Sequence, residues 1–533
     1  MPVKRPNVVM VVADDTTPSY HGCYGGPTPT PHIDRLANEG VRFERGYCNA
    51  SLCCPSRYTL FTGQYTQRSR WAHQDAAPHD PALISQNGML DPDTPTLARV
   101  LREAGYFTGH IGKWHSRFDT DDLGFEEPTV PKGDPDDPAV DAELRRRQAN
   151  AQEVVRRCAG FEVADRVNWG NIGGGIHEKI AKHNIGWLTD GALDFLEDAS
   201  SRGRPFYLHL ANSVPHSPSC QESFGADHRY TWGGKLEQAP VSHPADETVL
   251  ERMRAAGLRT DGPIAGVNAG QIQIDDQIGI LLARLEAMGE LDNTIFIYTA
   301  DHGIPGKGSC LMRGQHLPFV MRWPAGLPGG QVVSDIFSWS DTVPTLCDAC
   351  GVSMPAGHRL DGASVLPALR GSAPWPRTVS YHEMGWSRSV IKGRYQYIAT
   401  RYPSTALKAF AEGDSSVKPG TGQFFDDLNA PFVPDFFAPD QLYDLYTDPL
   451  ERVNLVDDPT RAGVLADLRR ELQAITDTMP RPFPAEPDPL LQSEQYLARL
   501  RERRAEVDAI RHYPDGDVPL IWYANLHDPG QVG

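Results

Sequence analysis

The chain has 533 residues, too many for one ordinary domain, and its 40% hydrophobic and 23% charged residues are typical of a globular protein. Its net charge of −18 argues against nucleic acid as a partner, so an anionic substrate would have to be attracted by local positive charge. No apolar run approaches the roughly 18 residues that a membrane span needs, so we expect no membrane partner. The opening MPVKRPNVVMVVADD reads as a first strand rather than a secretory signal, which predicts a cytoplasmic protein.

Buried strands alternate with amphipathic helices over residues 1–375, which predicts an α/β catalytic domain around a mostly parallel sheet. The strands are expected at 7–13, 106–111, 204–213, 293–300 and 317–323, and the helices at 32–40, 94–104, 185–197, 270–288 and 338–350. Residues 116–180 show little periodicity and predict an insertion with short helices. Residues 217–262 are expected to be irregular, and both stretches are expected to shape the substrate pocket.

The pattern changes beyond residue 375, and we expect a smaller α+β domain over residues 376–480. It would contain an exposed hairpin at 390–399, a strand and turn at 441–455, and a helix at 461–478. Residues 481–533 would form a last helix, at 495–510, and a tail with the apolar sequence IWY at 521–523. Because such an extension often packs on a second subunit, we expect a homo-oligomer, most simply a dimer.

Reactive side chains follow four of the expected strands. In parallel α/β sheets ligands bind at the carboxyl ends of the strands, so these groups are predicted to meet in one crevice. Taken singly, each aspartate could be a turn or cap residue and each histidine a surface residue; four coincidences at one edge favour a site. The groups are Asp14 and Asp15, Lys113 and His115, His216, and Asp301 and His302.

The stretch SLCCPSRYTLFTG, residues 51–63, carries the densest set of unusual residues. Pro55 suits the first position of a helix, whose free N–H groups would then point toward Cys53 and Cys54. With Arg57 in the first turn, this pattern predicts an anion held beside a sulfur-bearing side chain. The alternative is a buried cysteine pair in a loop. The nine cysteines are an odd number and widely spread, so we expect no disulfide framework.

Together these groups suit the transfer of a tetrahedral oxyanion group. Asp14, Asp15 and Asp301 offer the hard oxygen ligands that Ca²⁺ or Mg²⁺ prefers, with His302 as a tolerable fourth ligand. Positive charge and proton transfer would come from Arg57, Lys113, Lys307 and two histidines.

Several segments of the chain resemble the type I, formylglycine-dependent sulfatases of the alkaline phosphatase superfamily. Residues 53–57, CCPSR, fit the family's C-x-P-S-R signature. The segments NVVMVVADD, TPHIDRLANEGVRF, GYFTGHIGKWH, DNTIFIYTADHG and LYDLYTDPLERVNL resemble other segments of the family. The resemblance implies an alkaline-phosphatase-like α/β/α sandwich with a small C-terminal domain that contains an antiparallel sheet.

The resemblance also implies a mechanism for cleaving a small-molecule sulfate ester. A maturation enzyme would convert Cys53 to formylglycine, whose hydrate attacks sulfur. Arg57 and Lys113 would hold the diol, and His115 would deprotonate its second hydroxyl so that sulfate leaves. Lys307 and His216 would bind the sulfate and protonate the leaving oxygen. One divalent metal, calcium first, with Mg²⁺ or Mn²⁺ as alternatives, would be held by Asp14, Asp15, Asp301, His302 and the group derived from Cys53.

Three other functions fit parts of this pattern. His302 stands where many sulfatases have asparagine. Histidine at this position also occurs in the related phosphonate monoester hydrolases. Phosphonate monoester or phosphodiester hydrolysis is therefore the nearest alternative. Ser56 favours a sulfatase, because those relatives more often carry alanine at this position. An acyl-transfer enzyme using the Cys53 thiol with His115 would leave the aspartates unexplained, and a non-catalytic binding protein would leave the whole charged set unexplained.

Overall fold

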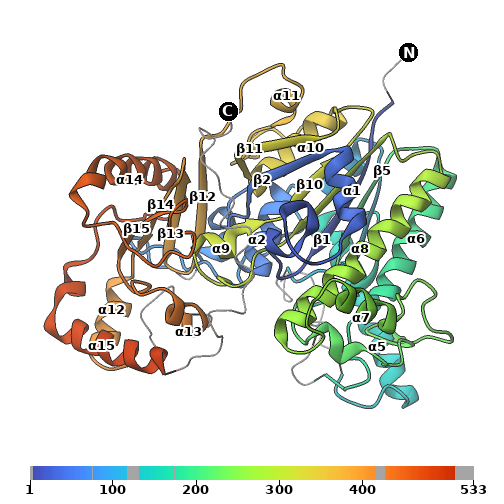
Figure 1. The fold of residues 1–533 in the computed structure, drawn as a ribbon, viewed down its shortest axis with the longest axis horizontal. Coiled ribbons are helices and arrows are strands. Elements are labelled where there is room, and N and C mark those ends of the chain that lie inside the picture. The colour runs from blue at the N-terminus through green and yellow to red at the C-terminus, as the bar shows by residue number, and fades with distance from the viewer. Residues whose placement is uncertain (1–3, 75, 117–130, 173–175, 415–425, 510–533) are drawn as a thin grey trace.

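The computed structural model describes residues 4–74, 76–116, 131–172, 176–414 and 426–509. Within them the chain forms a large mixed sheet with helices on both faces, and a smaller antiparallel sheet lies to one side (Figure 1). The α/β class and the predicted second, antiparallel sheet are both confirmed. None of the helices in the described part of the chain is long and apolar enough to cross a membrane.

The large sheet is mostly parallel, as predicted. Its strands pair in parallel, with two exceptions. Strand β10 is antiparallel to both of its neighbours, and the short β9 is antiparallel to β2. Its order is β11 (Gln331–Ser338), β2 (Val41–Tyr47), β10 (Phe319–Arg322), β8 (Thr294–Ala300), β1 (Asn7–Ala13), β5 (Phe206–Ala211), β3 (Phe107–Lys113) and β4 (Val163–Asn168), with β9 (His316–Leu317) paired to β2.

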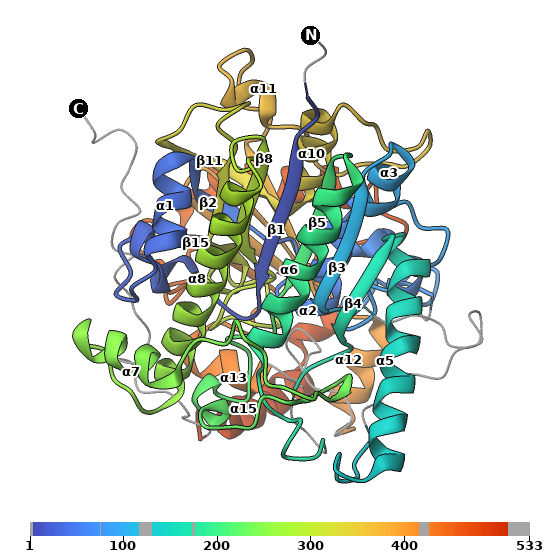
Figure 2. The ribbon, with the colours of Figure 1, turned by 90° about the vertical axis from the view of Figure 1, so that its right-hand side faces the viewer.

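Two helical layers enclose this sheet and make it an α/β/α sandwich (Figure 2). One layer contains α1 (Pro31–Glu39), α6 (Ile185–Arg202) and α8 (Pro263–Ala287), and the other contains α2 (Cys53–Thr62), α3 (Leu97–Glu103) and α10 (Thr342–Cys350). The central strand β1 is buried along its whole length, which explains its unbroken apolar sequence. The Cys53–Thr62 helix begins two residues before Pro55, so the predicted helix start is corrected.

The prediction for residues 116–180 is wrong where the structure describes them. Pro138–Ala159 form α5, a helix of 22 residues, and Val163–Asn168 add β4 as an edge strand of the large sheet. The helix buries only a narrow stripe that includes Leu144, Ala151, Val155 and Cys158, and charged residues between them hide its periodicity. Residues 217–262 also contain a helix that was not predicted, α7 (Asp246–Ala255), beside the two-residue strands β6 (Tyr230–Thr231) and β7 (Gly234–Lys235).

The smaller sheet consists of β12 (Val379–Met384), β13 (Ser387–Lys392), β14 (Tyr395–Thr400) and β15 (Asp440–Asp444), all antiparallel, with α14 (Ala462–Thr476) packed on it. The predicted hairpin is β13–β14, but most of its residues are buried, not exposed. Further on, α15 (Glu494–Asp508) packs on α12 (Ser404–Ala411). The IWY sequence at 521–523 lies outside the described residues. Short helices α9 (Met312–Gln315), α11 (Leu366–Leu369) and α13 (Asp426–Asn429) occupy the connections.

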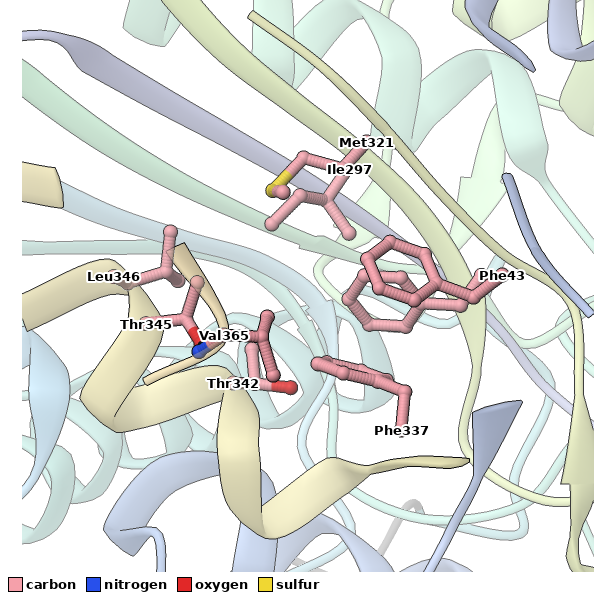
Figure 3. Close-up of a pocket in the computed structure, with 9 residues that line it drawn as sticks. Phe43, Ile297, Met321, Phe337, Thr342, Thr345, Leu346 and Val365 are labelled. Carbon is pink, nitrogen blue, oxygen red and sulfur yellow. The ribbon is translucent and has the colours of Figure 1, made fainter. Parts of the chain in front are cut away.

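A small pocket lies between the large sheet and α10 (Figure 3). Phe43, Phe319 and Phe337 face Leu346 and Val365 across it, and its polar side chains are the hydroxyls of two threonines. Because it contains no charged group, we interpret it as a packing gap in the core and not as a substrate site.

The glycine before Lys113 is needed for the close pairing of β3 with β5. Gly112 has φ +96°, and a Cβ there would lie 2.0 Å from the carbonyl oxygen of Ala211. We expect Gly112→Ala to lower the free energy of unfolding by at least about 2 kcal/mol, measured by urea denaturation.

Gly463, near the start of α14, is the matched control. A Cβ there meets nothing within 4 Å, so Gly463→Ala should leave stability unchanged or raise it by about 0.4–1 kcal/mol. Equal effects of the two substitutions would contradict this account of β3.

Candidate active site

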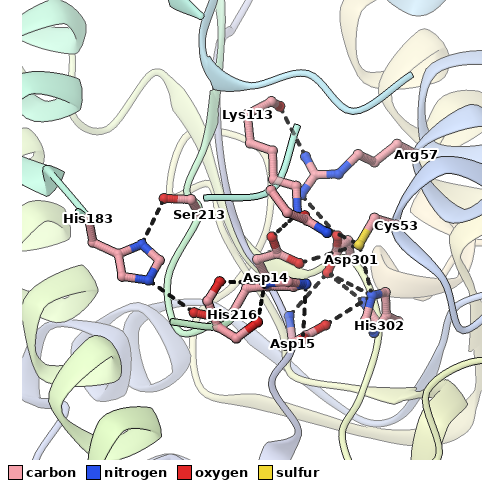
Figure 4. Close-up of polar contacts among 12 residues, drawn as sticks. Asp14, Asp15, Cys53, Arg57, Lys113, His183, Ser213, His216, Asp301 and His302 are labelled. Carbon is pink, nitrogen blue, oxygen red and sulfur yellow. Dashed lines mark hydrogen bonds and ion pairs between the residues drawn. The ribbon is translucent and has the colours of Figure 1, made fainter. Parts of the chain in front are cut away.

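Six of the residues expected at the four strand ends lie together at one edge of the large sheet (Figure 4). Asp14 and Asp15 follow β1, Lys113 ends β3, His216 follows β5, and Asp301 and His302 follow β8. Backbone hydrogen bonds continue past the strand ends: the Asp14 N–H donates to Val214 and the Asp301 N–H to Ala13, each at 3.0 Å. The strands therefore hold these side chains in fixed relative positions.

Three buried carboxylates are balanced by three buried cations. Lys113 forms an ion pair with Asp14, and the Lys307 Nζ lies 2.9 Å from both oxygens of Asp15. The third pair joins the Arg57 guanidinium to Asp301 at 2.9 Å. Arg57, Lys113, Asp14 and Asp301 are inaccessible to solvent, and unpaired charges there would be costly.

These cations keep the first two carboxylates ionised. Burial alone would raise the pKa of Asp14, but Lys113, followed by His216, Arg57 and Lys307, brings it well below the usual range. Burial opposes ionisation of Asp15 in the same way, and Lys307 is the main group that lowers its pKa. Both side chains therefore present negative oxygens at neutral pH.

The two adjacent cysteines face different surroundings. Cys53 is the first residue of α2, and its Sγ lies 3.3 Å from His302 Nε2 and 3.7 Å from both Asp14 Oδ1 and Lys113 Nζ. The Sγ of Cys54 lies 3.4 Å from the carbonyl oxygen of Gly88. Burial raises the pKa of Cys53 even though Lys113 opposes the shift, so the unmodified thiol would be a poor nucleophile at neutral pH.

Ser56 and Arg57 both hold Asp301. The Ser56 hydroxyl donates to the Asp301 backbone carbonyl, while Arg57 pairs with its carboxylate and donates to the Lys113 carbonyl at 3.3 Å. The first turn of α2 thus fixes the end of β8 against the end of β3. The family resemblance implied that Arg57 holds the nucleophile. The structure adds its contacts with the Asp301 carboxylate and the Lys113 carbonyl.

His115 is partly buried two residues beyond β3. Its backbone has φ 47°, a strained value for a residue with a side chain, and its N–H donates to the Trp169 carbonyl at 3.2 Å. Its Nδ1 is buried and has no hydrogen-bond partner among the described residues. Burial, helped by Lys113, lowers the pKa of His115 well below the ordinary value, so its ring is neutral and can accept a proton.

His183, which the sequence did not single out, holds the loop that carries His216. Its Nε2 lies 3.0 Å from the His216 carbonyl and 2.9 Å from that of Pro218, and its Nδ1 lies 3.1 Å from the Ser213 hydroxyl. Only a protonated Nε2 can bond two carbonyls, so Nδ1 accepts from Ser213. Burial lowers the pKa of His183 to about 4, which keeps this neutral form.

Three further residues contact the site cations or the loop that carries one of them. Asn171, after β4, accepts a hydrogen bond from Lys113 at 2.6 Å. Asn429 of α13 donates to the Lys307 carbonyl at 2.8 Å, and Glu451 accepts from the Met312 N–H at 2.8 Å. Asn429 and Glu451 come from the part of the chain beyond the large sheet, so that part supports the Lys307 loop. No strand end or motif marks these residues in the sequence.

The acidic groups fit a divalent cation. Two overlapping sets, Asp14 with Asp15, Cys53 and His216, and Asp14 with Cys53, Asp301 and His302, have ligand atoms within 4.8 Å of one another. The Nδ1 of His302 lies 3.2 Å from the Gly303 carbonyl, and its Nε2 lies 3.1 Å from Asp15 Oδ1. A cation held among these groups would be attracted by the three carboxylates, and oxygen-rich ligands favour Ca²⁺ or Mg²⁺.

Comparison with known proteins identifies the family. The sulfatase family model matches residues 6–352, which include every residue of the site described above except Asn429 and Glu451. The chain belongs to the sulfatase family.

Individual sulfatases and related enzymes resemble this chain at low identity. An N-acetylglucosamine-6-O-sulfatase of Bacteroides thetaiotaomicron is 25% identical over 456 residues, covering 71% of this chain and 74% of that protein. A solved structure described as bound to its substrate D-glucosamine-2-N,6-O-disulfate has a TM-score of 0.57 at 21% identity and covers 89% of this chain and 98% of that one. The phosphonate monoester hydrolase of Silicibacter pomeroyi has a TM-score of 0.57 at 19% identity, covering 89% and 95%. These likenesses show that the present chain has the alkaline-phosphatase-like fold that its sequence predicts.

The metal interpretation predicts stabilisation by calcium that depends on Asp301. Adding Ca²⁺ to protein dialysed against chelator should raise the melting temperature, since a ligand at 100 times its Kd stabilises the folded state by about 2.7 kcal/mol. Asp301→Asn should lose most of this shift.

Asp341→Asn is the matched control, because Asp341 is a buried aspartate paired with Arg377 at 2.6 Å, away from the site. It should lower stability yet keep the calcium shift. If both variants respond to calcium as the wild-type protein does, Asp301 is not a metal ligand.

Proposed function

We propose that this sulfatase hydrolyses sulfate monoesters with a nucleophile formed from Cys53. The observation that carries the proposal is the placement of its sulfur among Asp14, Lys113 and His302, while Cys54 faces Gly88. Family membership and the three carboxylates support it. A small-molecule sulfate ester is the substrate, and hydrolysis yields the free alcohol and sulfate.

Each charged residue then has a role in the reaction. The formylglycine made from this cysteine in the family supplies, as its hydrate, an oxygen nucleophile and a second hydroxyl. Lys113 and Arg57 hold the hydrate, and Lys307 and His216 bind the sulfate oxygens and protonate the departing alcohol. His115 takes the proton from the second hydroxyl, a role that its neutral ring and its unpartnered Nδ1 allow.

A divalent metal would be held by Asp14, Asp15, Asp301 and His302 together with the group at position 53. It would neutralise charge on the nucleophile and the sulfate. We propose calcium, because three carboxylates form a site that tolerates a large, hard cation. A maturation enzyme would have to act on residues 51–63 before folding buries Cys53. The cytoplasmic location and the dimer expected from the sequence remain predictions.

Substitutions of the two cysteines test the nucleophile. Cys53→Ser should lower kcat by at least about 1,000-fold, because a serine hydroxyl provides no second hydroxyl from which sulfate can be eliminated. Cys54→Ser should retain activity within about tenfold, since a serine hydroxyl can still donate to the Gly88 carbonyl. Turnover of an aryl sulfate measures both, and free turnover by Cys53→Ser would overturn the proposal.

Phosphonate monoester hydrolysis is the second candidate, favoured by His302 beside Cys53 and by the likeness to the Silicibacter enzyme. Comparing kcat/KM for an aryl sulfate and an aryl phosphonate monoester with the same leaving group decides between them. We expect the sulfate to be preferred by at least about tenfold, a difference of about 1.4 kcal/mol in transition-state binding. The reverse preference would assign the chain to phosphonate chemistry.

A further inference from the structure

Two histidines and an aspartate outside the active site form a cluster that the proposed reaction does not use. His228 lies just before β6, His243 lies three residues before α7, and Asp246 is the first residue of α7. One ligand atom from each of the three residues lies within 4.8 Å of the other two. All three side chains belong to the 217–262 stretch, which contains only short or isolated elements.

The nitrogens of these rings are buried without hydrogen bonds. Both ring nitrogens of His228 and of His243, and Oδ1 of Asp246, have no hydrogen-bond partner among the described residues. The two ring centroids are 3.7 Å apart, and His243 Nε2 lies 3.7 Å from Asp246 Oδ1, too far for a hydrogen bond. A neutral imidazole has one lone-pair nitrogen, so each ring offers one such nitrogen beside Oδ1 of Asp246, and this unsatisfied set points to a missing ligand that accepts lone pairs.

The surrounding contacts hold the cluster together. The second carboxylate oxygen of Asp246 accepts from the Gly225 N–H at 2.7 Å, and Asp190 of α6 accepts from the N–H groups of Val241 and Ser242. Gly186 lets the His243 backbone approach α6, because a Cβ there would lie 2.7 Å from the His243 Cβ. The Gly225 N–H thus orients the Asp246 carboxylate, in the way that hydrogen bonds usually orient the carboxylate ligands of a metal.

We propose that His228, His243 and Asp246 bind a zinc ion. Two neutral imidazoles and one carboxylate are typical zinc ligands, whereas the oxygen-rich active site suits calcium. Tetrahedral zinc places its ligand atoms roughly 3.3 Å apart, given bonds of about 2 Å, so small side-chain rotations would close the cluster. Water would take the fourth position.

This zinc would stabilise the structure of residues 217–262 beside the active site. Asn184 donates to the His228 carbonyl at 2.8 Å, and it is the neighbour in sequence of His183, whose ring holds the His216 loop. Binding would therefore link β6 and the start of α7 to the segment that supports His216. The inference does not depend on which ester the enzyme hydrolyses.

Zinc binding to metal-stripped full-length protein tests the proposal, with excess calcium present to fill the active site. Wild-type protein should bind one zinc, measured by equilibrium dialysis and elemental analysis, that His228→Gln/His243→Gln does not bind. The control His73→Gln/His79→Gln removes two histidines from another part of the chain and should keep the zinc. Equal zinc content in both double variants would overturn the proposal.

X-ray absorption at the zinc edge of the wild-type protein gives an answer that needs no variant. One equivalent of zinc should show two imidazole nitrogens and only nitrogen or oxygen ligands. Sulfur ligation, or fewer than two imidazoles, would place the ion elsewhere and overturn the proposal. Zinc should also slow proteolysis within residues 217–262 of the wild-type protein and leave the rate in His228→Gln/His243→Gln unchanged.

Discussion

Three carboxylates buried at one edge of a sheet are the constraint on which this structure depends. Asp14, Asp15 and Asp301 are each paired there with a cation, Lys113, Lys307 and Arg57 respectively, because an unpaired buried charge would be costly. Each cation comes from a different segment, so the charge balance is also a tertiary constraint. It joins the ends of β1, β3 and β8 to α2 and to the loop after β8.

This constraint explains why the short C-x-P-S-R segment determines so much of the site. Cys53 faces the acidic groups because α2 begins at that residue, and Ser56 and Arg57, one turn along, hold the backbone and the carboxylate of Asp301. The reacting group and the metal ligand are thereby positioned by the same helical turn. Asn429 and Glu451 extend this support from the smaller sheet's side to the Lys307 loop.

Much of this arrangement could be predicted because it follows from local sequence patterns. The apolar run of β1 identifies a strand buried on both faces, and reactive residues directly after such strands must share an edge. The helix α5 was missed because charged residues dilute its apolar stripe. His183, Asn171 and Glu451 were missed because their contacts arise only when distant segments pack together, which no local pattern records.

The central claim is that position 53, and not position 54, carries the reacting group. Fragmentation mass spectrometry of the tryptic peptide Gly46–Arg57 from active protein tests it most directly, because backbone cleavage between the two cysteines separates their masses. The account predicts an aldehyde residue at position 53 and an unmodified cysteine at position 54. An aldehyde at 54, or fully active protein with both thiols intact, would contradict it.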